Sequence, residues 1–348
     1  MPEYSNEYLS RYLPFLREFL HKINNSKFIK DNYEVDQVSL ANIEHFLSRP
    51  NYSYRYFSIS KKKSGLRTIY EPVASLKAIQ QYILEYYFNK NLIDFKFSKS
   101  VIGYLPNKSV KDNAEPHLNK KYLIQVDIKD FFPSITQTMV MTKIREKLSL
   151  SYEEAYMISK LTTRKGSLPQ GAPTSPFLAN ICAISLDNRV HGFIQWLKVK
   201  LPHVNIAYTR YADDLTFSCS SKINFSRFIT SIYNIIYDEG YIPNIEKTRV
   251  VPSKSQQKVT GIIVNTIMSI DKKERQELKF LLKVWLCYGF ENIQDVILRI
   301  LKKEDLKEDK LLEILGGKIA FIKYVNPTQA DKLSKLYEKV KLEYEKKI

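Results

Sequence analysis

The sequence predicts an α+β fold, because helical and extended patterns both occur along its 348 residues. Leucine and isoleucine recur every three or four positions over residues 7–23, the spacing that places side chains on one face of a helix. Residues 54–72 and 206–219 are typical instead of β-hairpins, with extended segments on both sides of a short turn. From about residue 271 the chain is rich in Lys, Glu and Leu, and we expect that part to be helical.

The remaining elements follow from the same patterns. An apolar run over residues 121–133 predicts a buried strand that ends near Phe131 to Pro133. Gly316 and Gly317 are expected to interrupt a C-terminal helix. Further helices are expected at residues 40–47, 76–87, 137–148, 152–161, 177–198 and 225–239, a Gly/Pro-rich loop at 164–176, and two short strands within 247–265.

The composition points to a folded protein that binds a polyanion. The formal net charge is +17, and such a field attracts nucleic acid first of all. The 24 Tyr and 18 Phe could stack on bases, although most of them must form the core. No apolar run approaches the ~18 residues of a membrane span, and the N-terminus lacks the pattern of a secretory signal. We therefore expect a cytoplasmic protein without a membrane partner.

Three acidic residues are candidates for a metal site. Asp127 lies inside an apolar strand, where a lone carboxylate is costly unless it is paired or binds a cation. Asp213 and Asp214 are adjacent at the turn of a hairpin, where repulsion raises a pKa unless a cation neutralises the pair. An Asp-Asp pair at a turn, taken alone, is most often a solvated surface feature. Together the three acids favour Mg²⁺, which prefers carboxylates, water and phosphate oxygens.

Three motifs, two of which contain these acids, resemble those of reverse transcriptases. Residues 211–214 read Tyr-Ala-Asp-Asp, and residues 127–132 resemble the first acidic motif of that family. Residues 168–176 with Asn180 match its LPQGxxxSPxxxN loop. The motifs occur in the order of the family, with 86 residues (213 minus 127) between the first and second acids. The resemblance covers roughly residues 50–265.

The resemblance implies a right-hand polymerase fold. It places fingers at 51–121 and a palm of antiparallel sheet and helices at 122–265, with a fingers insertion at about 140–176. Outside the motifs, we expect an N-terminal helical extension at residues 1–50, and a helical thumb at 266–348 by its position and helicity. The resemblance also implies two Mg²⁺ ions, for which Mn²⁺ could substitute, held by Asp127, Asp213, Asp214 and the backbone of Ile128. These ions would activate the attacking hydroxyl and stabilise the leaving pyrophosphate.

The same resemblance assigns further residues to the substrates. Lys63 and Arg67 at a hairpin tip would clamp the triphosphate of a dNTP, and Gln170 and Gly171 would lie along the nucleotide and template. Phe132 would be a steric gate against ribonucleotides. Lys247, in a loop at residues 244–248, would face the pyrophosphate. Tyr211 would support the primer end.

Two shorter motifs resemble those of retron reverse transcriptases. Asn113, Ala114 and His117 form an NAxxH pattern, and Val259, Thr260 and Gly261 form a VTG pattern near the expected primer grip. The retron type implies a structured non-coding RNA as template and primer, a branched RNA-linked DNA product, a separate effector protein and a role in bacteriophage defence. Alternatives are a group II intron-like or other defence-associated reverse transcriptase, an RNA-dependent RNA polymerase, and a non-catalytic RNA-binding scaffold.

Overall fold

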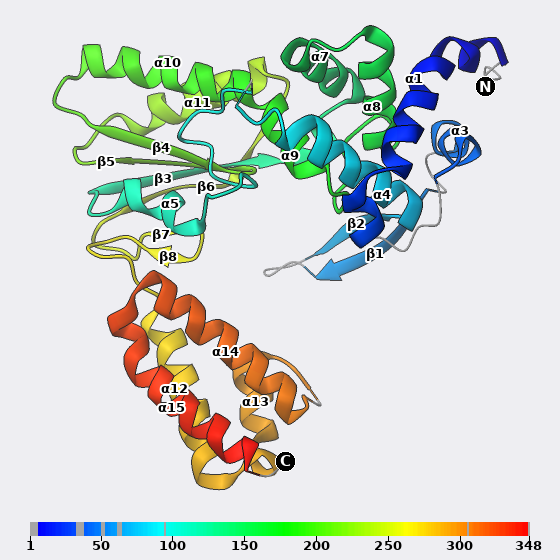
Figure 1. Cartoon of the computed structure of the whole chain (residues 1–348). Helices are drawn as coiled ribbons and strands as arrows, with labels where there is room; N and C mark the ends of the chain where they lie inside the picture. Colours follow the sequence, from blue (N-terminus) through cyan, green and yellow to red (C-terminus); the bar gives the residue numbers. More distant parts are fainter. Residues whose placement is uncertain are drawn as a thin grey trace.

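The computed structural model describes residues 6–32, 38–49, 53–60, 65–93, 95–304 and 306–346. At its centre lies a four-stranded antiparallel sheet with the strand order β4-β5-β3-β6 (Figure 1). Its strands are β3 (Tyr122–Lys129), β4 (Ile206–Tyr211), β5 (Asp214–Cys219) and β6 (Ile242–Pro252). β4 and β5 form the expected hairpin, so the two-residue turn of Ala212 and Asp213 lies at one end of the sheet.

The two faces of the sheet have different partners, because side chains alternate along each strand. α10 (Ile184–Lys200) and α11 (Phe225–Asp238) cover one face (Figure 1), and the ring of Phe217 meets that of Phe228 there with centroids 5.2 Å apart. The short helices α5 (Val110–Ala114) and η2 (Glu115–His117) lie on the other face. Val126 and Ile128 belong to the core on the α10 side. The intervening Asp127 therefore projects from the opposite face.

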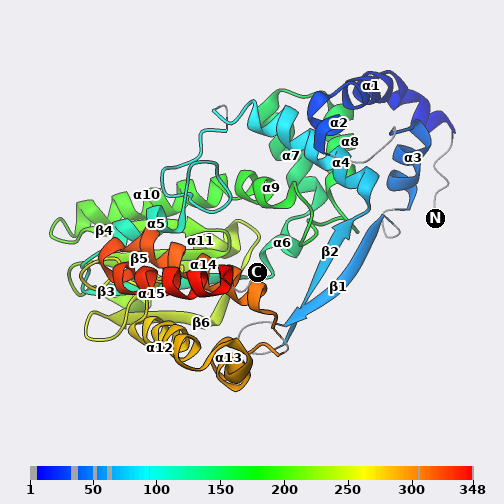
Figure 2. The same ribbon diagram turned by 60° about the horizontal axis from the view of Figure 1, so that its bottom comes forward.

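A helical body lies beside the sheet and shares its core. It contains α1 (Asn6–Asn24), α2 (Lys27–Asn32), α3 (Leu40–Ser48), α4 (Ala74–Ile83) with η1 (Leu84–Asn89), α7 (Gln137–Leu148) and α8 (Tyr152–Thr162). One cluster of buried side chains runs from Phe19 of α1 through Ile158 of α8 to Phe217 of β5. β1 (Tyr54–Ser60) and β2 (Leu66–Pro72) form a hairpin that projects from this body (Figure 2).

The C-terminal part forms a helical bundle with a core of its own. It follows the short hairpin of β7 (Lys258–Val259) and β8 (Ile262–Ile263), and consists of α12 (Lys272–Tyr288), η3 (Phe290–Ile293), α13 (Gln294–Leu301), α14 (Glu308–Val325) and α15 (Pro327–Glu345). The second core cluster also includes Ala114, Leu123 and Val259, which join the bundle to the sheet. None of the described helices combines the length and apolarity that a membrane crossing requires.

Three details of the sequence prediction are wrong. β3 ends at Lys129, because Asp130 adopts a left-handed conformation (φ 48°) and the short helix α6 (Phe131–Ser134) follows. The expected helix at 177–198 is two helices, α9 (Ser175–Cys182) and α10, separated at Ala183. The expected loop at 244–248 lies within the long strand β6, at the irregularity where its register with β3 shifts between Asn244 and Arg249.

The expected helix break at Gly316 and Gly317 is also wrong. α14 is continuous, because Leu315 and Ile319 are buried and their packing outweighs the helix penalty of about 1 kcal/mol per glycine. Packing explains Gly316, since a Cβ there would lie 2.6 Å from the hydroxyl oxygen of Tyr337 in α15. The glycine thus allows α14 and α15 to approach closely.

Candidate active site at the ends of β3 and β5

The three acids of the sequence motifs come together at one end of the sheet. Asp127 on β3 lies directly opposite Asp214 on β5 in the antiparallel register. The backbone N–H of Ile128 donates to the carbonyl oxygen of Asp213 at 3.0 Å, which ties the turn to β3. Residues 86 positions apart in the sequence (213 minus 127) thus share one small region of the sheet.

Strand β6 supplies two polar partners for Asp127. The Nζ of Lys247 lies 2.9 Å from each carboxylate oxygen of Asp127, and the side-chain amide of Asn244 donates to Oδ1 at 2.9 Å. The Asp127 side chain is only 10% exposed, whereas that of Lys247 is 61% exposed. The nearly buried carboxylate is therefore neutralised by a lysine that reaches it from solvent.

The two acids of the turn have raised pKa values. Desolvation by the surrounding protein raises the pKa of Asp214 to about 6, and the negative charges of Asp213 and Asp127 add to this rise. Burial, followed by repulsion from Asp127, also raises the pKa of Asp213, while Lys247 and Arg67 act in the opposite direction. The positive charges of Lys247 and Arg67 therefore do not offset the burial and repulsion that raise the pKa of Asp213.

The donor set fits a divalent cation by its chemistry. Carboxylate oxygens are hard ligands, and a cation beside them would relieve the repulsion that raises the two pKa values. Within the part of the chain that the structure describes, no three acidic, His or Cys side chains already surround one point. Lys247 instead holds both oxygens of Asp127. A bound cation at Asp127 would therefore have to replace this lysine.

An aromatic group lines the same end of the sheet. The Tyr104 ring lies between those of Phe132 and Tyr211, with centroid distances of 6.3 and 6.1 Å. Phe132 is half-buried on α6, directly after the strand that carries Asp127. The pKa of Tyr104 is raised, chiefly by burial and then by the charge of Asp213, so its hydroxyl stays protonated near neutral pH. Aromatic surface thus flanks the carboxylates.

The expected nucleotide-binding loop lies against the β1–β2 hairpin. The backbone N–H of Tyr70 on β2 donates to the carbonyl oxygen of Gln170 at 2.7 Å. A Cβ on Gly171, whose φ is +115°, would lie 2.7 Å from a methyl carbon of Ile69. The absence of a side chain at Gly171 therefore allows the backbone of the loop to lie close to β2. Arg67 is exposed on β2, and Lys63 lies outside the described residues.

The NAxxH motif supports the β4–β5 hairpin from the face opposite α10. His117 is fully buried, and its two ring nitrogens lie 2.8 Å from the hydroxyl oxygens of Ser218 on β5 and Thr209 on β4. Burial lowers the pKa of His117 to about 3. Because the low pKa keeps the ring neutral near pH 7, one ring nitrogen donates and the other accepts.

The NAxxH and VTG motifs also contact each other. The side-chain amide of Asn113 donates to the Thr260 hydroxyl at 3.4 Å, and that hydroxyl donates to the carbonyl oxygen of Val110 at 3.4 Å. Thr260 (φ 44°) and Gly261 (φ 89°) form the left-handed turn between β7 and β8. Ala114 and Val259 are fully buried. α5 is therefore packed between the central sheet and the β7–β8 hairpin.

The same segment reaches the C-terminal bundle. The hydroxyl of Tyr324 on α14 donates to the Ser109 hydroxyl oxygen at 2.8 Å. The Nζ of Lys111 lies 5.3 Å from the centroid of the Tyr324 ring, a cation–π contact. Sheet, short hairpin and bundle thus meet at residues 109–117.

Residues 59–280 match the family described as reverse transcriptase (RNA-dependent DNA polymerase). The chain belongs to this family. It is 31% identical over 275 residues to the Retron Ec86 reverse transcriptase of Escherichia coli, covering 77% of this chain and 81% of that protein. It is 30% identical over 302 residues to the Retron Ec73 reverse transcriptase of Escherichia coli, covering 81% and 86%. It is 30% identical over 320 residues to the Retron Mx65 reverse transcriptase of Myxococcus xanthus, covering 86% and 68%.

These relatives make the chain a retron-type reverse transcriptase, and thus an RNA-directed DNA polymerase. The predicted family, enzyme class and right-hand polymerase fold are confirmed. Enzymes of this family use divalent metal ions. Among solved structures, a telomerase from Candida albicans with a TWJ fragment of telomeric RNA aligns with a TM-score of 0.47 at 11% identity, over 86% of this chain and 65% of that one.

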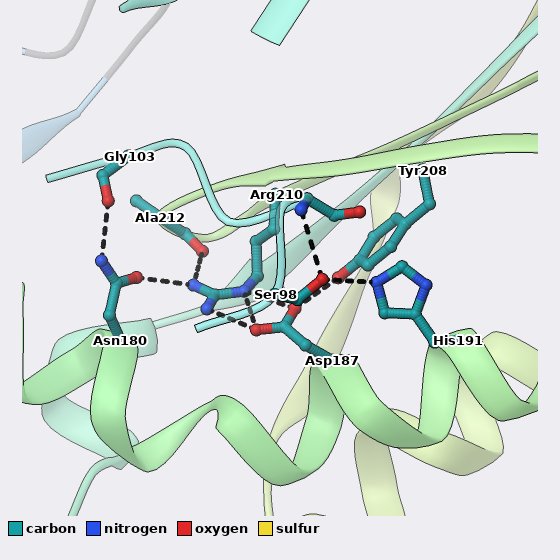
Figure 3. A network of polar contacts seen from close by, with 9 residues as sticks. Ser98, Gly103, Asn180, Asp187, His191, Tyr208, Arg210 and Ala212 are labelled. Atoms are coloured by element: carbon teal, nitrogen blue, oxygen red, sulfur yellow. Dashed lines mark hydrogen bonds and ion pairs between the residues drawn. The ribbon is translucent and has the colours of Figure 1, made fainter. Parts of the chain in front are cut away.

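Several residues at the site of this reverse transcriptase were missed by the sequence prediction. Tyr104 follows Gly103, where a Cβ would lie 2.8 Å from the backbone nitrogen of Ala212. Arg210 and Asp187 form a fully buried ion pair beneath the same turn (Figure 3). Arg210 directly precedes the Tyr-Ala-Asp-Asp motif, and the one available signal was a charged residue in a segment that otherwise lacks charge and is expected to be a strand.

The neutral state of His117 predicts a pH effect on stability. Its pKa is about 3 in the folded protein against an ordinary 6.5, so below pH 6.5 the unfolded chain binds a proton that the folded chain does not. Stability from this residue is therefore present above pH 6.5 and falls by about 1.4 kcal/mol per pH unit below it. His117→Gln keeps a donor and an acceptor but does not titrate.

We expect wild type to lose stability relative to His117→Gln as the pH falls from 7 to 5. Urea unfolding at several pH values, followed by circular dichroism, measures this difference directly. Parallel pH dependences for the two proteins would contradict a neutral buried imidazole.

Proposed function

We propose that this reverse transcriptase copies a structured non-coding RNA into single-stranded DNA that stays linked to the RNA by a branch, using Asp127, Asp213 and Asp214 with two Mg²⁺ ions. Mn²⁺ would be a substitute. The observation that carries the proposal is the pairing of Asp127 with Asp214 across β3 and β5, with Asp213 tied to Ile128. When bound, the ions would lower the barrier by activating the attacking hydroxyl and stabilising the leaving group.

In this proposal Lys247 has two partners in turn. Without substrate it neutralises Asp127, as the 2.9 Å contacts indicate. Since its side chain is largely exposed, it is free to turn toward the pyrophosphate of a bound dNTP once Asp127 binds a cation. Asn244 would keep Asp127 oriented during this exchange, because an amide donor holds a carboxylate without competing for its charge.

Other residues would position the substrates. Phe132 would exclude a 2′-hydroxyl from the nucleotide pocket, and Tyr211 would support the primer end beside Tyr104. Arg67, together with Lys63, would bind the triphosphate, while Gln170 and Gly171 would lie along the nucleotide. The backbone of Ile128 would complete the metal site.

The partners in this proposal are the RNA, its DNA product, dNTPs and a separate effector protein. The retron relatives support the RNA, and a net charge of +17 supports extensive contact with phosphate. The VTG turn at Val259, Thr260 and Gly261 would contact the primer-template through its left-handed backbone. We place the complex in the cytoplasm and its role in bacteriophage defence.

The nucleic acid that copurifies with the protein tests the proposal. The protein would be expressed with the DNA that flanks its gene, and its bound nucleic acid would be treated with RNase, DNase or a debranching enzyme. We expect a DNA strand that stays linked to an RNA residue after RNase and is released by debranching. RNA without attached DNA would favour the alternative of a non-catalytic RNA-binding scaffold.

A further inference from the structure

A buried guanidinium holds the turn of the Tyr-Ala-Asp-Asp motif from below. Arg210 on β4 is fully buried, and its Nε and Nη2 donate to the carboxylate of Asp187 at 2.9 and 2.7 Å (Figure 3). Its Nη1 donates to the side-chain oxygen of Asn180 at 3.0 Å and to the carbonyl oxygen of Ala212 at 3.1 Å. One side chain therefore joins α9, α10 and the turn.

The contact with Ala212 falls on a critical peptide. The Ala212 carbonyl belongs to the peptide bond between Ala212 and Asp213. A hydrogen bond to this oxygen therefore fixes the orientation of the peptide plane that precedes Asp213. Ala212 is also in the left-handed region, with φ 58°, a conformation that a residue with a Cβ adopts only when its surroundings hold it there. Arg210 supplies a fixed donor at this point.

The turn is held from its outer side as well. The side-chain amide of Asn180 donates to the carbonyl oxygen of Gly103 at 2.7 Å, while Gly103 itself lies against the backbone of Ala212. The backbone of Arg210 exchanges hydrogen bonds with Ser100 and Ile102 at 2.7 and 2.9 Å. The turn is thus enclosed by residues 100–103 and by α9.

The same contacts connect the turn with the nucleotide-binding loop. α9 begins at Ser175, directly after the loop that carries Gln170, and Asn180 lies on this helix. The Asp187 carboxylate accepts from Arg210 and from the hydroxyl of Tyr208 at 2.7 Å, and both of these donors lie on β4. The Asp187 carboxylate is the counter-ion that offsets the desolvation cost of the buried guanidinium.

We propose that Arg210 is a positioning residue for DNA synthesis, which fixes the peptide between Ala212 and Asp213 and thereby the direction of the Asp213 carboxylate. Asp187 keeps the guanidinium in place, and Asn180 aligns it with α9. The proposal rests on the catalytic role proposed for Asp213. A buried ion pair alone does not require an arginine, whereas simultaneous contact with Asp187, Asn180 and Ala212 requires its planar fork.

Arg210→Lys tests this role because it keeps the charge beside Asp187 but cannot reach all three partners. We expect the KM for dNTPs and the Kd for a primer-template duplex to change less than threefold. We expect kcat to fall at least about 30-fold, which is about 2 kcal/mol. We also expect Mg²⁺ alone to raise the Tm of the variant less than that of wild type, because the Asp213 carboxylate is no longer held in one direction. A purely structural arginine would leave kcat per folded molecule unchanged.

Arg189→Lys is the matched control. Arg189 lies on the same helix as Asp187 and pairs with Asp238 and Glu239, but this pair is at the surface. The control should keep the kcat and the Mg²⁺ response of wild type. If Arg210→Lys does not fold, Asn180→Ala removes one partner only, and a smaller loss of kcat at unchanged KM is expected.

Two results would overturn the proposal. One is a folded Arg210→Lys protein with unchanged kcat and unchanged Mg²⁺ response, and the other is a loss of activity that only follows the folded fraction. Asp213→Asn distinguishes a failure of the positioning role of Arg210 from a failure of the proposed catalytic site. If that variant is inactive while Arg210→Lys is fully active, only the positioning role fails. If Asp213→Asn is itself active, the proposed catalytic site fails.

Discussion

Asp213→Asn is expected to lower dNTP incorporation by about 10³-fold or more while binding of the RNA is retained. The amide loses the negative charge that the turn would offer to a divalent cation, and such an ion contributes several kcal/mol to the reaction. The fold should not suffer, since burial and repulsion from Asp127 already disfavour the charged form of Asp213. Primer extension with Mg²⁺ and a filter-binding assay with RNA measure the two quantities.

Asp238→Asn provides a comparison of the same chemical type. Asp238 is an exposed carboxylate on α11 that pairs with Arg189 at the surface. This variant should extend primers at the wild-type rate. Near-wild-type incorporation by Asp213→Asn would mean that the metal site of this enzyme uses other ligands.

The site could be foreseen where a short motif determines it. The Tyr-Ala-Asp-Asp turn is local in sequence, and extended residues on both sides of it indicate a hairpin. Asp127 could be foreseen because a carboxylate in an apolar strand needs a partner. That β3 lies beside β5 came from the resemblance to a family, since strand order follows from long-range packing and not from either segment alone.

The supporting contacts could not be foreseen in the same way. Arg210 and Asp187 are 23 residues apart, and nothing in the residues between them shows that α10 covers the face of β4 that Arg210 occupies. Lys247 was expected in a loop, yet it lies in β6 where the register with β3 shifts between Asn244 and Arg249, and its amine reaches Asp127. Such contacts depend on which face of a strand or helix is buried, and this is determined by the packing of the helices on the sheet.

Phe132→Ala is expected to reduce the preference for dNTPs over ribonucleotides by about tenfold to a hundredfold. An aromatic ring beside the sugar would clash with a 2′-hydroxyl, and steric overlap in a packed site costs about 1–3 kcal/mol. The ring is half-buried on α6 and in contact with Tyr104, so it cannot easily turn aside. Single-nucleotide incorporation with matched dNTP and rNTP pairs, expressed as the ratio of kcat/KM values, measures the effect.

Phe132→Tyr separates the size of the ring from its position. It keeps the ring and adds only a hydroxyl, so discrimination should stay close to that of wild type. The KM for dNTPs should rise modestly in Phe132→Ala, because the pocket then lacks one wall, while the acids at Asp127 and Asp213 are untouched. If Phe132→Ala rejects ribonucleotides as strongly as wild type does, another side chain must exclude the 2′-hydroxyl, and Tyr104, which contacts both Phe132 and Tyr211, becomes the first candidate.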